Sequence, residues 1–161
     1  MLRVLAIDPG VNHVGVVLID EYGVSCAMTL AFKGAVKGNY LAVAERCREI
    51  AAAITPLLVE WKHDVTVMES WTYMASRTNA SSIWETPYTI GYLQHLIEEA
   101  DGKPCVLQSS PEVLRQTGSK ADRKHWVKRI PFWQKLTNEH TISAAIHGWH
   151  YIEKATRPRL F

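Results

Sequence analysis

Two short apolar runs, each followed directly by an acidic residue, constrain the fold of this chain more than any other feature. Residues 2–7 are mostly apolar and suited to β structure, and an Asp-Pro-Gly turn that starts at Asp8 ends the run. Residues 65–68 form a second short apolar run, and Glu69 follows it. The sequence therefore predicts two buried strands that each carry a carboxylate at the carboxyl end.

The other segments predict a mixed α/β sheet flanked by helices. Residues 13–19 and 24–32 are expected strands with a turn between them, so the first three strands form a meander. Amphipathic spacing and short apolar runs predict the remaining elements, which are helices over 40–61, 81–101, 111–116, 121–135 and 138–155 and a strand over 105–107. Pro56 is expected to kink or split the first helix. Three sequential strands followed by alternating helices and strands are typical of one mixed five-stranded sheet.

Composition limits the class of protein. The 161 residues suit a single domain over 1–161, and the content of 47% apolar and 21% charged residues argues against disordered and fibrous chains. A net charge of +2 is too small to indicate nucleic-acid binding by itself, so a DNA-binding surface needs unevenly placed charges. Three scattered cysteines indicate reduced thiols. With no recognisable signal segment or membrane-spanning run, we expect a cytoplasmic protein without membrane contact.

The two strand-end carboxylates together predict a metal site. If the strands that end at Asp8 and Glu69 are neighbours in the sheet, the two like charges lie side by side, which is costly unless a cation binds. A hard divalent ion such as Mg²⁺ takes oxygen ligands and supplies that compensation. A lone acidic residue in a turn would carry no such implication, so the prediction depends on the pair.

Several motifs resemble those of the RuvC-type Holliday junction resolvases in order and spacing. They are Ile7-Asp8-Pro9-Gly10 followed by Gly15, Val67-Met68-Glu69, Tyr73-Met74-Ala75, Ser110-Pro111-Glu112-Val113, and Gly118-Ser119-Lys120-Ala121-Asp122-Arg123-Lys124. Each motif is weak alone, since Asp-Pro-Gly is only a turn, but together they span nearly the whole chain. The short length and divergent tail are closer to a phage or other mobile-element branch than to a bacterial housekeeping protein.

The resemblance implies an RNase H-like fold, a homodimer, and an endonuclease that resolves four-way DNA junctions with paired symmetric nicks. It also implies hydrolysis with two Mg²⁺ ions per active site, for which Mn²⁺ substitutes. The family's metal ligands are an Asp on the first strand, a Glu on the fourth, and a pair one turn apart on the last helix, either two acids or His and Asp. Asp8, Glu69 and His140 match the first three positions, so the resemblance makes them metal ligands and catalytic residues.

Ser143 stands where the resemblance leads us to expect an aspartate. Residues 140 and 143 share one face of a helix, yet a hydroxyl is a poorer ligand for a hard cation than a carboxylate. Three explanations compete: an introduced inactivating change, replacement of the missing charge by Glu139, and metal binding that is naturally weak. Glu139 lies about a quarter turn from His140, so we favour an altered or weakened site over full compensation.

Candidate DNA contacts follow from the same resemblance. In relatives, the basic segment after Gly118 flanks the catalytic cleft and contacts phosphates, which adds salt-sensitive affinity. An aromatic residue in the loop after Glu69 stacks on unpaired bases at the crossover. The candidates are Tyr73, Arg77, Lys120, Arg123, Lys124 and Lys128. From composition alone, the basic run is more typical of a solvated helix face, and Trp71 and Trp84 are more typical of core residues.

The resemblance also predicts a dimer contact, because two symmetric cuts need two active sites. It assigns this contact to the helix that contains Tyr88, Tyr92, Leu93 and Leu96. The same side chains are equally suited to packing against the sheet, so the sequence leaves both interpretations open.

Three alternative functions compete with junction resolution. The first is a protein that grips branched DNA without cutting it, which Ser143 makes plausible. The second is a different RNase H-like nuclease that acts on RNA:DNA hybrids, flaps or forks, because a fold does not determine a substrate. The third is an actin-like sugar or acetate kinase, whose first strand also carries an acidic turn. The short chain argues against the kinase, since those enzymes need two such domains and more glycine-rich phosphate loops.

Overall fold

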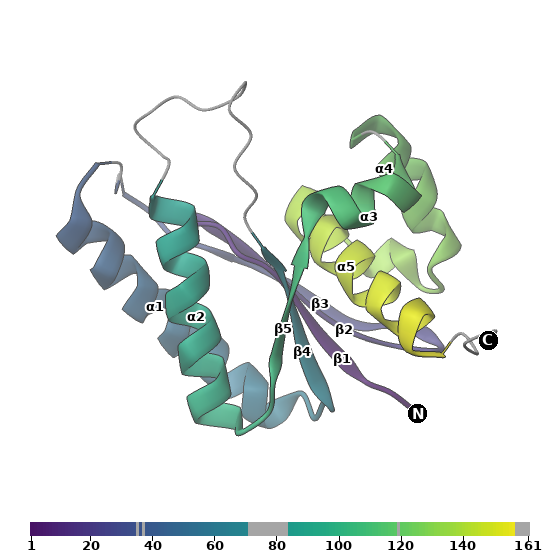
Figure 1. Cartoon of the computed structure of the whole chain (residues 1–161), viewed down its shortest axis with the longest axis horizontal. Coiled ribbons are helices and arrows are strands. Elements are labelled where there is room, and N and C mark those ends of the chain that lie inside the picture. Colours follow the sequence, from purple (N-terminus) through teal and green to yellow (C-terminus); the bar gives the residue numbers. More distant parts are fainter. Residues whose placement is uncertain (35, 37, 71–83, 119, 157–161) are drawn as a thin grey trace.

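The structure, a computed structural model, describes residues 1–34, 36, 38–70, 84–118 and 120–156 of the chain (Figure 1). A mixed five-stranded sheet lies at its centre in the order β3-β2-β1-β4-β5. The strands are β1 (Val4–Asp8), β2 (His13–Asp20), β3 (Gly23–Ala31), β4 (Val65–Ser70) and β5 (Cys105–Ser109). The first three strands pair antiparallel as a meander, whereas β4 pairs parallel with both β1 and β5. This arrangement confirms the mixed sheet that the sequence predicts.

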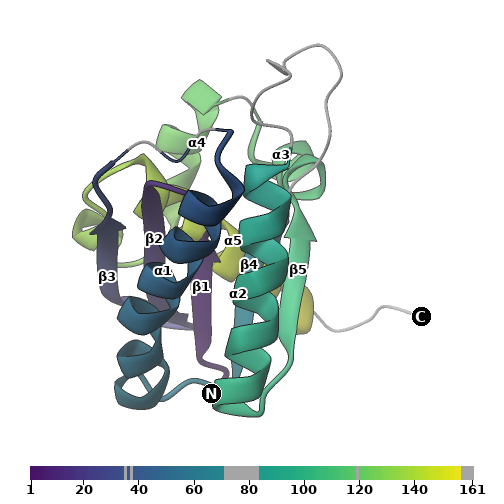
Figure 2. The same cartoon turned by 90° about the vertical axis from the view of Figure 1, so that its left-hand side faces the viewer.

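Three long helices cover the two faces of the sheet. They are α1 (Tyr40–Glu60), α2 (Glu85–Asp101) and α5 (Glu139–Thr156). In the central strand β1, Val4 and Ala6 pack into the core under α5, whereas Leu5 and Ile7 pack into the core under α1 and α2. All four side chains are fully buried, which explains why the apolar run of β1 is continuous. Figure 2 shows α1 and α2 on one face of the sheet and α5 behind it.

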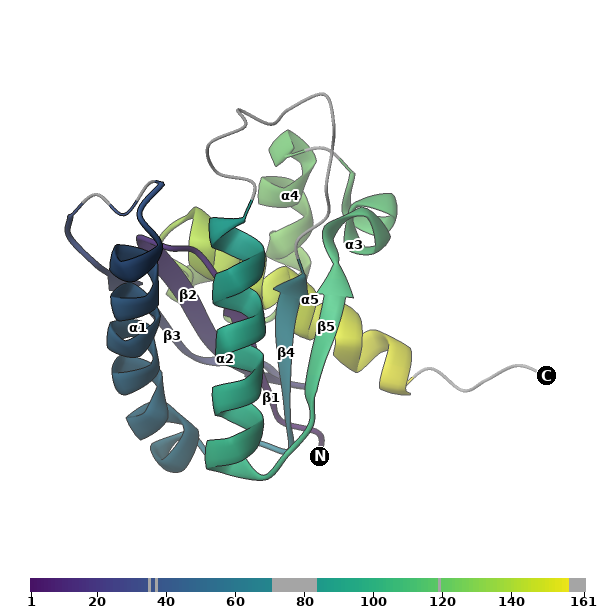
Figure 3. The same ribbon diagram turned by 60° about the vertical axis from the view of Figure 1, so that its left-hand side comes forward.

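The carboxyl ends of β1, β4 and β5 lie at one edge of the sheet, because these three strands are parallel. Two short helices, α3 (Ser110–Thr117) and α4 (Lys120–Trp126), follow β5 at this edge (Figure 3). The edge therefore brings together the ends of the two strands that carry the predicted carboxylates and the segment that carries the predicted basic residues.

One predicted helix ends earlier than expected. The continuous helix over residues 121–135 is wrong, since α4 ends at Trp126 and two single 3-10 turns follow, η2 (Val127–Arg129) and η3 (Trp133–Lys135). Pro131 explains the break, because proline disfavours helical backbone at the preceding residue. Ile130 is extended, with φ −81° and ψ 122°. By contrast, α1 runs uninterrupted through Pro56, so of the two predicted effects of this proline the split does not occur and the kink stays a prediction.

The helix assigned to dimerisation divides its side chains between two partners. Leu93 of α2 is buried in the core between the sheet and the helices α1 and α2, in the same cluster as Leu5 and Ile7. Tyr88 and Tyr92 instead pack with Trp84 against a small buried cluster centred on Val43 of α1. The interpretation in which Leu93 faces the sheet is thus confirmed, and a dimer contact through the tyrosines stays a prediction.

Two expectations from composition can be compared with the structure. Cys26, Cys47 and Cys105 are all free thiols, as the scattered spacing predicts. Within the described residues, no helix is both long enough and apolar enough to cross a membrane.

Candidate active site

Asp8 and Glu69 lie side by side at the carboxyl ends of β1 and β4. The two strands are parallel neighbours, and Ile7 pairs with Met68, so the next residue of each strand reaches the same level of the sheet. The two side chains are 16% and 20% exposed, respectively. The prediction that the fold places these two carboxylates next to each other is therefore correct.

The pair is electrostatically strained in the absence of a cation. Burial raises the pKa of Asp8 to about 8, and the neighbouring charge of Glu69 and a hydrogen bond to it act in the same direction. Burial also pushes the pKa of Glu69 upward, but contacts with His147, Ser110 and Ser143 outweigh it and lower the pKa to about 2. At neutral pH the two carboxyl groups therefore share one proton.

The first turns of α5 bring the two predicted helix residues to this pair. Nδ1 of His140 lies 2.9 Å from Oδ2 of Asp8, and Oγ of Ser143 donates a hydrogen bond of 2.9 Å to Oε2 of Glu69. Because the two residues are one helical turn apart, each meets a different carboxylate. The structure thus brings together all four residues that the sequence places in the centre.

The close approach of α5 to β1 depends on Gly15. This glycine pairs with Asp8 in the ladder between β1 and β2. A Cβ atom at Gly15 would lie 2.3 Å from the backbone oxygen of His140, a distance that no side chain tolerates. Glycine at this position therefore lets the start of α5 pack directly on the sheet.

Asn138 caps α5 and ties it to the sheet. Its Oδ1 accepts hydrogen bonds of 3.1 Å from the backbone N–H groups of His140 and Thr141. Its Nδ2 donates to Oγ1 of Thr29 on β3 at 2.6 Å. A side chain that satisfies the first N–H groups of a helix stabilises the helix start. Here the same side chain holds the helix start in place over β2 and β3.

Two histidines of this centre escape prediction from the sequence. His13, the first residue of β2, stacks on His140 with ring centroids 5.3 Å apart. His147 lies on α5 one turn beyond Ser143 and is 1% exposed, with Nε2 3.5 Å from Oε2 of Glu69. The helical spacing of residues 140, 143 and 147 is the available signal for His147. The contact of His13 depends on strand register and leaves no such signal.

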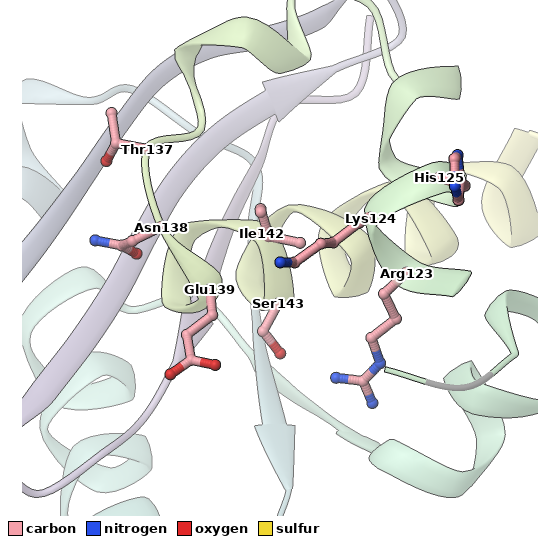
Figure 4. A pocket seen from close by; sticks show the side chains of 8 residues that line it. All are labelled: Arg123, Lys124, His125, Thr137, Asn138, Glu139, Ile142 and Ser143. Atoms are coloured by element: carbon pink, nitrogen blue, oxygen red, sulfur yellow. The ribbon is translucent and has the colours of Figure 1, made fainter. Parts of the chain in front are cut away.

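The basic residues of α4 line a pocket next to this centre. The pocket has a volume of about 820 Å³ and is lined by Arg123, Lys124, His125, Thr137, Asn138, Glu139, Ile142 and Ser143 (Figure 4). Arg123 and Lys124 extend from α4 toward the face of α5 that carries Ser143, as Figure 4 shows. Nη2 of Arg123 donates a hydrogen bond of 3.3 Å to Oγ of Ser110, and the charge of Arg123 opposes the rise in the Asp8 pKa.

The other predicted site residues have different placements. Glu139 is exposed and lines the same pocket as Ser143. Lys128 lies beside the ring of Trp133, with Nζ 5.9 Å from the ring centroid, and does not line the pocket. Lys120 is the first residue of α4. Tyr73 and Arg77 lie outside the described residues, so their roles stay predictions.

The donor groups of the centre suit a divalent cation, although the ligands are not assembled in advance. In the part of the chain that the structure describes, no three His, Cys, Asp or Glu side chains are grouped closely enough to hold a metal ion. The two carboxylates share one proton, and a hard cation that takes oxygen ligands can replace that proton. His140 adds a nitrogen donor beside Asp8. Asp8 and Glu69, with His140 next to them, therefore fit such an ion.

Comparison with solved structures shows which fold this is. Thermus thermophilus RuvC in complex with a Holliday junction substrate resembles the chain with a TM-score of 0.75 and 16% identity, over 96% of both chains. The chain has the fold of RuvC. A second T. thermophilus RuvC structure matches with a TM-score of 0.73, again with 16% identity over 96% of both chains. Fowlpox virus resolvase in complex with Holliday junction DNA matches with a TM-score of 0.55 and 12% identity, over 97% of this chain and 100% of the resolvase.

The RuvC fold confirms the predicted RNase H-like architecture. No protein-family model matches the chain, and no curated protein sequence matches it either. The TM-scores of 0.75 and 0.55 to the RuvC and fowlpox structures establish the fold, whereas identities of 16% and 12% do not establish an activity. The activity has to be argued from the residues of the site.

Proposed function

We propose that this protein is a divalent-cation-dependent endonuclease that resolves four-way DNA junctions by paired symmetric nicks. The observation that carries the proposal is the carboxylate pair of Asp8 and Glu69, which holds a single proton and is contacted by His140 and Ser143 of α5. In this chain, which has the fold of RuvC, these groups lie at the edge of the sheet where the parallel strands end. Two structures of similar fold are junction complexes, which supports branched DNA as the substrate.

The residues of the site divide the work of hydrolysis. A divalent ion held by Asp8 and Glu69, Mg²⁺ or Mn²⁺, would supply Lewis acidity for phosphodiester hydrolysis. His140 contacts Asp8 and orients that carboxylate. Arg123 and Lys124 lie beside the pair and are suited to binding the phosphates that flank the cut, because guanidinium and ammonium groups form strong hydrogen bonds to phosphate. No covalent intermediate with a protein side chain is required.

The homodimer and the wider DNA contacts belong to the same proposal. Two cuts placed symmetrically in a junction need two identical sites related by a twofold axis. Lys120 is the first residue of α4 and Lys128 lies in the 3-10 turn after it, and Tyr73 and Arg77 follow Glu69 in sequence. We assign phosphate contacts to the basic residues and base stacking to Tyr73.

The proposal is tested by nicking of a synthetic four-way junction in the presence of Mg²⁺ or Mn²⁺. The wild-type protein is expected to produce two symmetric nicks, and excess EDTA to abolish them. Glu69→Gln should lower the nicking rate at least about 100-fold, because loss of a metal ligand costs several kcal/mol of transition-state stabilisation. The matched control Glu99→Gln removes an exposed acid of α2 and should cut like the wild type. Absence of product with both metals would contradict the proposal.

Substrate competition separates junction resolution from other nuclease activities. Unlabelled junction, flap, fork and RNA:DNA hybrid substrates are added in turn to the labelled junction reaction. The four-way junction is expected to compete best, because a dimer with two active sites matches its symmetry. Stronger competition by a hybrid or a flap would assign the site to a different RNase H-like nuclease.

A second candidate function is junction binding without cleavage, and Ser143 favours it. Its hydroxyl offers no charge to a cation at the position where the resemblance leads us to expect a carboxylate. If the wild-type protein binds junctions without cutting them and Ser143→Asp cuts, the protein is a binding module with a disabled nuclease centre. If both proteins bind and neither cuts, the assignment of the active site is wrong.

A further inference from the structure

A buried histidine faces the carboxylate pair from a position that the resemblance does not assign. His147 lies on α5 and is 1% exposed, and its Nε2 makes no hydrogen bond of ordinary geometry to any described residue. This atom lies 3.5 Å from Oε2 of Glu69, slightly beyond the usual length of an N–H···O bond. Burial without a partner is costly for a polar nitrogen, so the placement of Nε2 requires an explanation.

The opposite side of the imidazole is held by Gln108. Nδ1 of His147 lies 3.2 Å from Oε1 of Gln108, which is itself buried at 6% exposure. Gln108 and Glu69 are direct partners on the neighbouring strands β5 and β4. The ring is therefore clamped between two residues of adjacent strands, and its orientation is set by the sheet.

The clamp determines which group His147 presents to Glu69. A rotation of the Gln108 amide by half a turn exchanges its oxygen, which accepts, for its nitrogen, which donates. If the amide nitrogen donates to Nδ1, the neutral ring carries its proton on Nε2; if the amide oxygen accepts from Nδ1, a second proton on Nε2 makes the ring cationic. The remaining tautomer would point a lone pair at the carboxylate and is disfavoured. An N–H group therefore faces Glu69 in both favourable arrangements.

We propose that His147 is a positioning residue, which orients Glu69 for the divalent cation while Gln108 fixes the imidazole. The inference deepens the proposed nuclease function and rests on it. Ser143 donates to Oε2 of Glu69, the same oxygen that His147 approaches. Both contacts hold Oε2 from the side of α5, so they fix the orientation in which Glu69 would present its carboxylate to a cation. Partners that orient a ligating carboxylate typically change metal affinity by about 10–100-fold.

The test measures Mn²⁺ binding by titration calorimetry in the absence of DNA. His147→Phe removes the N–H group and should weaken Mn²⁺ binding by about 10–100-fold. His147→Gln keeps an amide N–H within reach of Glu69 and should restore the affinity to within about threefold of the wild type. A purely structural role for the ring would not distinguish the two variants in this way. Circular dichroism melting establishes that each variant is folded.

A matched control lies on the same helix. His150 is also 1% exposed, but its Nε2 faces Glu112, at 3.7 Å, rather than Glu69. His150→Phe should therefore lose stability like His147→Phe and bind Mn²⁺ like the wild type. If His147→Phe does not fold, Gln108→Leu tests the same clamp from β5, with an expected loss of affinity of about tenfold.

The outcomes separate this inference from the proposed function. Wild-type affinity in His147→Phe, or in Gln108→Leu where the phenylalanine variant does not fold, overturns the positioning role and leaves the nuclease proposal intact. Equal loss in His147→Phe and His150→Phe also overturns the positioning role, because the effect would then come from the packing of α5. A wild-type protein that takes up no Mn²⁺ overturns the proposed cation-dependent function and the inference with it.

Discussion

Removal of the Asp8 carboxyl group is expected to stabilise the protein at alkaline pH when no divalent cation is bound. In the folded protein the pKa of Asp8 is about 8, against an ordinary value of 3.8, chiefly because the group is buried. Between these two values the unfolded chain has lost a proton that the folded protein still holds, so the free energy of unfolding falls as pH rises. Asp8→Asn carries no such proton, and its amide has nearly the shape of the neutral acid.

The magnitude follows from the width of the pH window. Each pH unit over which the folded protein holds one extra proton lowers the free energy of unfolding by about 1.4 kcal/mol. From about pH 5.5 to the Asp8 pKa of about 8, the loss amounts to about 3 kcal/mol. Glu69 acts in the opposite direction, since its pKa of about 2 lies below the ordinary 4.5. The stability that Glu69 contributes is fully present at pH values above its ordinary pKa of 4.5, so it is constant between about pH 5.5 and about pH 8.

The assay is urea unfolding followed by circular dichroism, in EDTA, at about pH 5.5 and about pH 8.5. Relative to the wild type, Asp8→Asn should gain about 3 kcal/mol on going from the lower to the higher pH. Asp64→Asn, which removes an acid at the opposite end of β4, serves as the control and should keep the pH dependence of the wild type. If the difference between wild type and Asp8→Asn is the same at both pH values, Asp8 does not hold the proton and the argument for a strained pair fails.

Three further predictions concern the surroundings of the pair. Gly15→Ala should lower the free energy of unfolding by at least about 2 kcal/mol in urea titration, because the new Cβ overlaps the backbone of α5. Gly91→Ala is the control: its added Cβ meets no neighbouring atom within 4 Å outside its own helix, so it should raise the free energy of unfolding by about 0.5–1 kcal/mol. Asn138→Ala should cost about 1 kcal/mol in the same assay through loss of the helix cap, and an unchanged midpoint would argue against that role. Arg123→Ala and Lys124→Ala should each weaken junction binding and reduce the slope of log affinity against log salt by about 1, measured by fluorescence anisotropy in EDTA; an unchanged slope would remove the residue from the DNA surface.

The parts of the fold that were predictable are those with a local cause. The strand that ends at Asp8 is recognisable because a buried apolar run meets a turn, and the same holds for the strand before Glu69. Helical spacing likewise places His140 and Ser143 on one face of α5. The end of α4 was missed although Pro131 is plain in the sequence, because the amphipathic pattern continues past it and suggests a longer helix.

The parts that were not predictable depend on contacts between distant segments. Helical spacing puts His147 on the same face of α5 as His140 and Ser143, but its polar role depends on the neighbouring strands that carry Glu69 and Gln108. The stacking of His13 on His140 depends in the same way on the register of β2. Such contacts join three or four elements, and no periodicity within a single element encodes them.

Ser143 decides how much negative charge the centre carries. Its hydroxyl donates a hydrogen bond to Glu69, which an ionised aspartate cannot do because a carboxylate only accepts. An aspartate there would add a third carboxylate to a pair that already shares one proton, so it would ionise with a cation bound and would otherwise stay protonated with a raised pKa. The hydroxyl therefore weakens the attraction for cations and, by the same change, makes the carboxylate pair less strained than three carboxylates would be when no cation is bound.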